Sequence, residues 1–200
     1  MLASSPSFRG AMPIFCITVL FSMLFIPARL LAQAGATGGV LVGSGTAKTG
    51  TTSLTQEGIS DWAHWGQSDA TSFDHKAEGG SQISNVTAVG PGNGSGHVFW
   101  YGSSALSHSW SDGTPTATAS SVQPGIFAPA AGDGFSLTVP ADASTRTLKL
   151  YAGGWNSTGL LQAHLSDGSA PDYSNASFSD PNGNTYASQY TLTYHAASPG

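Results

Sequence analysis

The stretch DWAHWGQ, which begins at Asp61, places two tryptophans, a histidine and an aspartate within five positions. A sugar ring has an apolar face of C–H groups that stacks on aromatic side chains, while polar side chains bond its hydroxyls. Trp62 and Trp65 are therefore candidate platforms for a sugar. Asp61, His64 and Gln67 are candidate polar partners. The alternative is that these rings form the heavy part of a hydrophobic core.

The spacing within this stretch limits how it can bind. In a strand, Trp62 and His64 point to one face, and Ala63 and Trp65 point to the other. Two tryptophans on opposite faces cannot form one flat platform, so at most one of them serves a ligand and the other belongs to the core. A helical turn would bring the two rings together, but the flanking glycines favour a short extended segment.

A second candidate is GGWNSTG, which contains Trp155 and Asn156. Trp155 follows two glycines where a strand is expected to end, and loops carry many binding residues. Trp100, Tyr101 and Trp110 are further aromatic candidates, although Trp110 lies in an expected strand where a core position is favoured. The ligand-binding residues that we predict are Trp155, Asn156, Trp65, Asp61 and His64.

Metal binding is a weaker interpretation. The histidines are scattered without H-x-H or H-E-x-x-H spacing, which disfavours zinc. Two Gly- and Pro-rich loops carry oxygen ligands of the kind that calcium prefers, although neither matches an EF-hand. The residues that would bind this structural calcium are Asp167, Asp172, Asp180 and Asn182.

Catalysis has little support, so we predict that the chain is not an enzyme. A glycosidase needs two carboxylates about 5–10 Å apart, one of them with a raised pKa. Glu57 and Glu78 are the only glutamates, and neither lies in apolar surroundings. The sequence contains no G-x-S-x-G motif, although an acid–base pair of Asp61 and His64 stays open.

The elements that must position these residues are strands. Short alternating or β-branched runs recur at a spacing of about ten residues and are separated by turn residues, which is typical of an all-β fold. In GFSLTVP, Phe135, Leu137 and Val139 are predicted to face inward. In RTLKLYAGG, Leu148 and Leu150 share one face, and we expect the two runs to be neighbours in a hairpin. The predicted fold is an antiparallel β-sandwich of jelly-roll or immunoglobulin-like character.

The first 34 residues differ from the rest of the chain. A cationic start, an apolar run and an A-x-A site predict a secretory signal, with cleavage after Ala34. Pro13, Pro27 and Arg29 interrupt the run, which disfavours the alternative of an uncleaved membrane anchor. Residues 35–50 are predicted to be a flexible linker or a loosely held first strand, followed by a sandwich domain at 51–200. The predicted location is therefore extracellular or at the cell surface.

Composition narrows the possible partners. The only cysteine, Cys16, lies in the predicted signal, so the processed chain forms no disulfide of its own. Without Arg9 and Arg29, four basic residues remain against eleven acidic ones. This balance argues against nucleic acid and anionic membranes. A glycan is the expected partner, and the alternative role is that of a structural or adhesion spacer; a hydrolase accessory or catalytic domain is a third, unfavoured role.

The region from 51 to 198 resembles a bacterial secreted β-sandwich module. The matching motifs are DWAHWG, SFDHK, QIS, HSWSDGTPT, GFSLTVPAD, TRTLKLYAGGW, LSDGSAP and YTLTY. The resemblance implies fold and location but no activity. It also implies a further strand after the final SPG, so we expect the native chain to continue past Gly200. The VPAD to RTLKLYAG segment is more loosely similar to the jelly-roll domains of carbohydrate-binding modules, and such a likeness of fold does not fix function.

Overall fold

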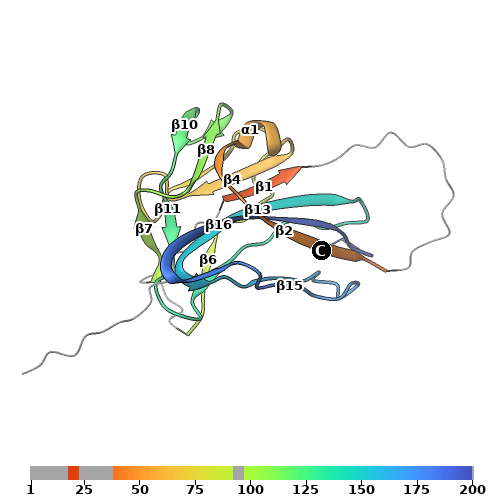
Figure 1. Cartoon of the computed structure of the whole chain (residues 1–200). Coiled ribbons are helices and arrows are strands. Elements are labelled where there is room, and N and C mark those ends of the chain that lie inside the picture. Colours follow the sequence, from red (N-terminus) through yellow and green to blue (C-terminus); the bar gives the residue numbers. More distant parts are fainter. Residues whose placement is uncertain (1–17, 23–37, 92–96, 200) are drawn as a thin grey trace, which may run out of the picture.

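The computed structural model describes residues 18–22, 38–91 and 97–199, and these residues form an all-β structure with several antiparallel sheets (Figure 1). The elements are β1 (Thr18–Ser22), β2 (Val40–Ala47), β3 (Gly50–Ser53), α1 (Leu54–Glu57), β4 (Asp61–Trp65), β5 (Phe73–Lys76), β6 (Thr87–Val89), β7 (Phe99–Tyr101), β8 (Leu106–Trp110), β9 (Gly113–Thr114), β10 (Ala119–Val122), β11 (Gly125–Phe127), β12 (Gly134–Ser136), β13 (Arg146–Thr158), β14 (Leu161–Ala163), β15 (Tyr173–Asn175) and β16 (Ser179–His195). The all-β class predicted from the sequence is confirmed.

A seven-stranded sheet runs through the molecule in the order β2-β16-β13-β1-β4-β5-β9, and all its neighbouring strands are antiparallel. Its longest pair is β13 with β16, which starts at Arg146 opposite Tyr194. Along β16, Tyr190, Leu192 and Tyr194 are buried while the threonines between them are partly exposed. This alternation places one face of the pair against a core.

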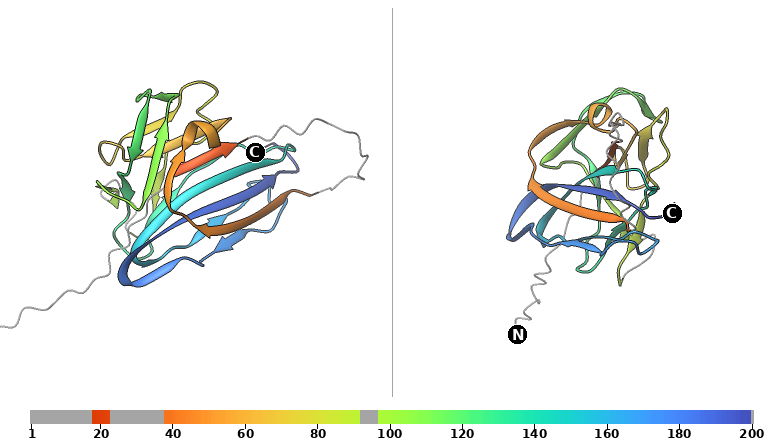
Figure 2. Two further views of the ribbon diagram at one scale, coloured as in Figure 1. Left: turned by 45° about the horizontal axis from the view of Figure 1, so that its top comes forward. Right: turned by 90° about the vertical axis from the view of Figure 1, so that its right-hand side faces the viewer.

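Smaller elements cover both faces of this central sheet (Figures 1 and 2). On one face, β12, β14 and β15 pack over a first core cluster, whose buried residues are Ala63, Trp65, Ile83, Ile126, Leu148, Leu150, Leu165, Tyr190, Leu192, Tyr194 and Ala196. On the other face, α1, β8 and β10 pack over a second core cluster, made of Leu54, Trp62, Leu106, Trp110, Val122 and Tyr151. The arrangement is β-sandwich-like.

The expected faces of two runs are confirmed, but their pairing is not. Phe135, Leu137 and Val139 pack against the first core cluster while the residues between them are exposed. Leu148 and Leu150 belong to the same cluster. However, β12 pairs with β6, and β13 pairs with β1 and β16, so the predicted hairpin was wrong. Alternation fixes which face of a strand is buried, but it does not choose the neighbouring strand.

The N-terminal region is only partly described. Of the predicted signal at 1–34, the described residues are 18–22, which form β1 between β13 and β4. Residues 40–47, expected in a flexible linker or a loosely held first strand, pair with β16 along their whole length as the edge strand β2. Eight paired residues hold this segment to the sheet, so it is not a free linker. Among the described residues, no helix has the length and apolarity needed to cross a membrane.

Candidate functional site

All five residues of β4 are buried, because both faces of this strand are covered. Trp62 is fully buried in the second core cluster, with its ring centroid 5.3 Å from that of Trp110. Its indole N–H donates to the Asp112 carboxylate at 2.9 Å. Trp65 lies on the opposite face, stacks on Phe73 and donates to the side-chain oxygen of Asn85 at 2.7 Å. The predicted division of the two tryptophans between faces is confirmed, but both are core residues.

Asp61 has a structural role in the interior. Its Oδ1 accepts the backbone N–H of Trp62 at 2.9 Å. Its Oδ2 accepts the N–H groups of Gln82 and Ile83 at 2.7 and 2.9 Å. With 1% of its surface exposed, Asp61 joins β4 to the loop before β6 and does not face a ligand.

His64 is also enclosed. Its surface is 0% exposed, and its ring lies against the rings of His108 and Trp110 at centroid distances of 5.5 and 5.4 Å. Burial lowers the pKa of His64 to about 4, so the imidazole is neutral at neutral pH. The structure thus places three predicted ligand residues, Asp61, His64 and Trp65, away from the surface, and we do not include them in the site.

Trp155 and Asn156 lie together near the end of β13, at a bulge in its pairing with β16. The Trp155 indole N–H donates to the carbonyl oxygen of Gly183 at 2.8 Å, and Asn156 Oδ1 accepts the N–H of the same glycine at 3.1 Å. Asn156 has a φ of 49°, a left-handed conformation that asparagine tolerates better than most residues. Both side chains therefore hold the bulged segment 180–184 of β16 while remaining partly exposed.

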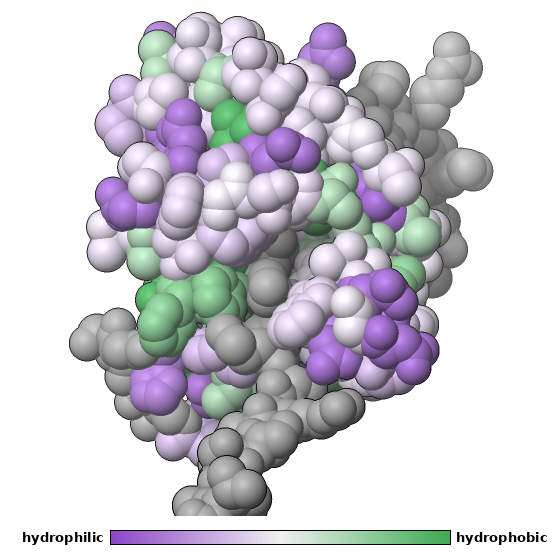
Figure 3. Space-filling view, turned by 60° about the vertical axis from the view of Figure 1, so that its left-hand side comes forward, coloured by the Kyte–Doolittle hydropathy of each residue, from purple (hydrophilic) through white to green (hydrophobic). Residues whose placement is uncertain are grey.

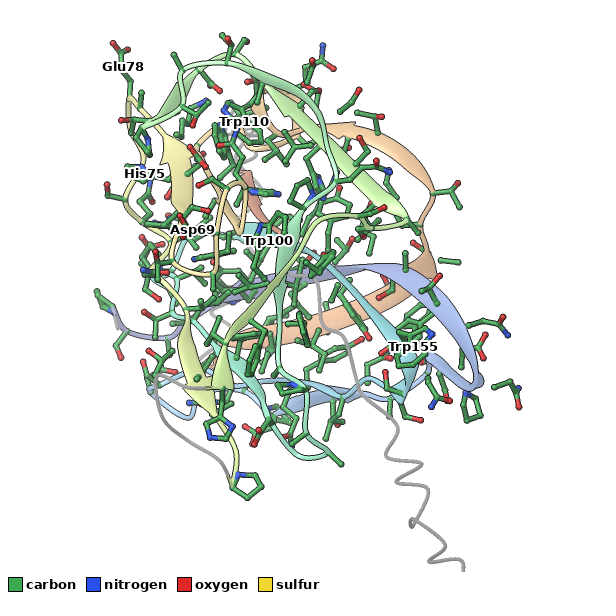
Figure 4. All side chains as sticks on the ribbon, turned by 90° about the vertical axis from the view of Figure 1, so that its left-hand side faces the viewer. Asp69, His75, Glu78, Trp100, Trp110 and Trp155 are labelled. Carbon is green, nitrogen blue, oxygen red and sulfur yellow. The ribbon has the colours of Figure 1, made fainter. Side chains whose placement is uncertain are left out.

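A different exposed aromatic pair lies on β7. Phe99 and Trp100 are each 44% exposed, and Figure 3 shows a patch of apolar side chains on the side of the molecule where β7 lies. As adjacent strand residues, the two rings point to opposite faces and do not form one platform. The Trp100 indole N–H donates to the carbonyl of Gly66 at 2.9 Å. Figure 4 shows Trp155 well apart from Trp100, and Trp110 is buried, so the tryptophans form no exposed strip.

Beside Asn156, the structure contains a cleft of about 630 Å³. The central sheet contributes Tyr186 and Tyr190 from β16, together with small and apolar residues of β13. Residues 130–136 and 156–162 form further walls. The volume lies within the range of about 300–1,000 Å³ that small-molecule sites occupy. The cleft therefore has the size of a binding site for a small ligand.

The polar groups around the cleft are mostly neutral. Burial raises the pKa of Tyr186, and the hydroxyl of Ser157 faces the Tyr186 hydroxyl. Asn156 and Gln162 add carboxamides at the lining. The Asp133 side chain is 1% exposed, and its Oδ2 lies 3.2 Å from Nδ1 of His97. The Ser157 and Tyr186 hydroxyl oxygens are themselves buried. The lining therefore offers a ligand the exposed hydroxyls of Ser136 and Thr158 and the amides of Asn156 and Gln162, with its single carboxylate already facing an imidazole.

The residues predicted to bind calcium hold turns. Asp167 accepts N–H groups of Ser169, Ala197 and Ser198, and the hydrogen bonds from Ser169 lower its pKa to about 2. Asp180 accepts the N–H of Asn182 at 3.0 Å, and Asp172 is exposed. Within the described ranges, no three His, Cys, Asp or Glu side chains are grouped to hold a metal ion. The calcium site stays a prediction.

Comparisons of the chain with protein families, with characterised proteins and with solved structures found no match. The site therefore rests on its own geometry. Sequence reasoning identified Asn156 but missed Gln162, Tyr186 and Tyr190, because Gln162 lies on β14 and both tyrosines lie on β16, and only the fold brings these strands to Asn156 on β13. The alternation of YTLTY, which predicts that Tyr190 faces inward, was the one available signal.

Proposed function

We propose that the chain is a secreted, non-catalytic β-sandwich module of jelly-roll or immunoglobulin-like type that binds a saccharide in the cleft beside Asn156. The single observation that carries this proposal is the composition of the cleft. Its size suits a small ligand, and tyrosine rings, hydroxyls and carboxamides line it together. Carbohydrates need this combination, since they present apolar C–H faces and neutral hydroxyls at once.

The charges at the cleft support a neutral ligand. None of the residues that line it is lysine or arginine, which are the side chains that bind phosphate and carboxylate groups. Asp133 is its only acidic residue and is almost fully enclosed. The processed chain would be acidic overall, which further disfavours anionic ligands.

The same geometry favours binding over hydrolysis. A glycosidase requires a pair of carboxyl groups flanking the scissile bond, and the cleft lining contains one. Elsewhere, hydrogen bonds from Lys149 and Tyr151 outweigh the effect of burial and lower the pKa of Glu57. A lowered pKa is the opposite of what a general acid needs at neutral pH.

The proposal is tested by screening the exported, folded protein on a glycan array and measuring the affinity of each hit by calorimetry. Gln162→Ala removes an exposed amide at the cleft, and Gln56→Ala removes an exposed amide on α1 as a matched control. We expect Gln162→Ala to weaken binding by about fivefold, the effect of one hydrogen bond of about 1 kcal/mol. The control variant should bind like the parent protein.

Asn156→Asp is a second probe. Aspartate tolerates the left-handed backbone and keeps an oxygen to accept the N–H of Gly183, but it loses the amide donor. We expect a similar loss of affinity with no change in thermal stability beyond about 1 kcal/mol. A folded protein that binds no glycan would contradict the proposal and favour the alternative role as an extracellular spacer.

A further inference from the structure

β1 occupies the middle of the central sheet although it belongs to the predicted signal. Thr18 lies opposite both Tyr151 of β13 and His64 of β4, and Phe21 lies opposite Leu148 and Asp61. Both strands run antiparallel to β1. If the signal is removed at Ala34, as the proposed export requires, the sheet loses its central strand and β13 no longer has a partner on that side.

The residues that flank β1 show what this position requires. On one face, Trp62, His64 and Tyr151 are each 0% exposed. On the other face, Ala63 and Leu150 belong to the first core cluster. A strand between β13 and β4 is therefore enclosed on both faces by buried side chains. Leaving the position empty would create a cavity and leave a row of buried backbone N–H and C=O groups without hydrogen-bond partners, and both effects destabilise a fold.

We propose that, in the processed protein, the gap between β13 and β4 is a strand-accepting site filled by an extended segment of another polypeptide. The position of β1 defines the chemistry of this partner: an uncharged segment of about five residues, apolar at its three middle positions and antiparallel to β13 and β4. Strands β2 to β16 each already have a place in one of the sheets. Each strand among residues 38–91 and 97–199 therefore already has its own pairing, and the segment that fills the gap comes from outside these residues.

The test uses protein recovered after export, whose first residue is identified by intact mass. A fluorescent peptide with the sequence of residues 17–23 serves as the probe. We expect saturable binding to protein that begins near Gly35. We also expect no binding of the Leu20→Pro peptide, because proline cannot donate to a neighbouring strand.

Cross-linking tests the register. The processed chain contains no cysteine, so Thr147→Cys gives a single thiol opposite position 22 of the peptide. The matched control is Lys149→Cys, which lies opposite position 20. With a Ser22→Cys peptide, we expect about tenfold more disulfide at position 147, because opposed residues lie within disulfide reach and residues two positions away do not.

Three results would overturn the proposal: a purified protein that retains residues 18–22, a processed protein that binds no peptide, or equal cross-linking at both positions. The second result would show that the gap is closed by the chain itself. Glycan titration of the same samples distinguishes this failure from failure of the proposed function, because the cleft shares only Leu150 with the residues that pair with β1. The intact mass of the protein also reports a failure of export, because protein that is not exported retains residues 1–34.

Discussion

Asp61 shows how a residue type suited to ligand chemistry is used for structure instead. Its two carboxylate oxygens accept three backbone N–H groups, two of them from the loop at 82–83. A carboxylate with this many backbone donors fixes the path of the chain, and its burial follows from those bonds. The same side chain near the surface would have been a plausible sugar ligand, so identity and spacing alone do not decide its role.

We expect Asp61→Ala to lower the free energy of unfolding by about 2–4 kcal/mol, because it leaves buried N–H groups without acceptors. Urea denaturation measures this loss. Asp172→Ala, at an exposed aspartate, is the control and should change stability by less than about 0.5 kcal/mol. Glycan binding by folded Asp61→Ala should be unchanged; loss of binding with intact stability would instead return Asp61 to the ligand site.

His64 makes stability depend on pH. Its pKa falls from 6.5 to about 4 in the folded protein, so the unfolded state binds the proton more tightly. The stability contributed by neutral His64 is complete above pH 6.5 and is lost as the pH falls toward 4, by up to about 3 kcal/mol. His64→Phe should reduce the pH dependence of the unfolding free energy over this range without removing it, because burial also lowers the pKa of the neighbouring His108. Substitution of exposed His164 by glutamine should leave the pH dependence unchanged. If the unfolding free energies of the parent protein and His64→Phe depend on pH in the same way, His64 is not a source of the pH dependence.

At the scale of elements, the sequence predicts which face of a strand is buried better than it predicts which strands pair. The alternation in 134–139 and in β13 correctly identified which side chains are buried, because period-two patterning follows directly from strand geometry. The pairing of β12 with β6 joins residues almost fifty positions apart, and no local pattern encodes it. For the same reason, the burial of both tryptophans in β4 was unpredictable, since the covering elements come from α1, β8 and more distant loops.

The turn after β4 provides a prediction at this scale. Gly66 has a φ of +84°, and a Cβ there would lie 2.3 Å from the backbone carbon of Gly125. Gly168 has a φ of +65° but open space around it. We expect Gly168→Ala to cost about 1 kcal/mol through backbone strain alone, and Gly66→Ala to cost more than about 3 kcal/mol. Similar melting temperatures for the two variants would show that this close approach is unimportant.

At the scale of the whole molecule, the candidate site exists because β12 and β14 cover the face of the sheet that carries the first core cluster. The cleft combines residues from β6, β12, β13, β14 and β16, so it forms where the cover over the first core cluster meets the ends of the long strands. The obvious aromatic sequence motif is used to build the interior. Gln162, Tyr186 and Tyr190, which belong to no such motif, lie with Asn156 at the cleft that we propose for binding.

The most direct test of this account is an NMR titration of ¹⁵N-labelled, exported protein with the best saccharide from the array. We predict saturable shifts of the side-chain amides of Asn156 and Gln162 and of the backbone near Tyr186 and Tyr190. The buried indole N–H signals of Trp62, Trp65 and Trp110 should not move. Shifts centred on Trp100 and β7, with the cleft unaffected, would contradict the proposed site.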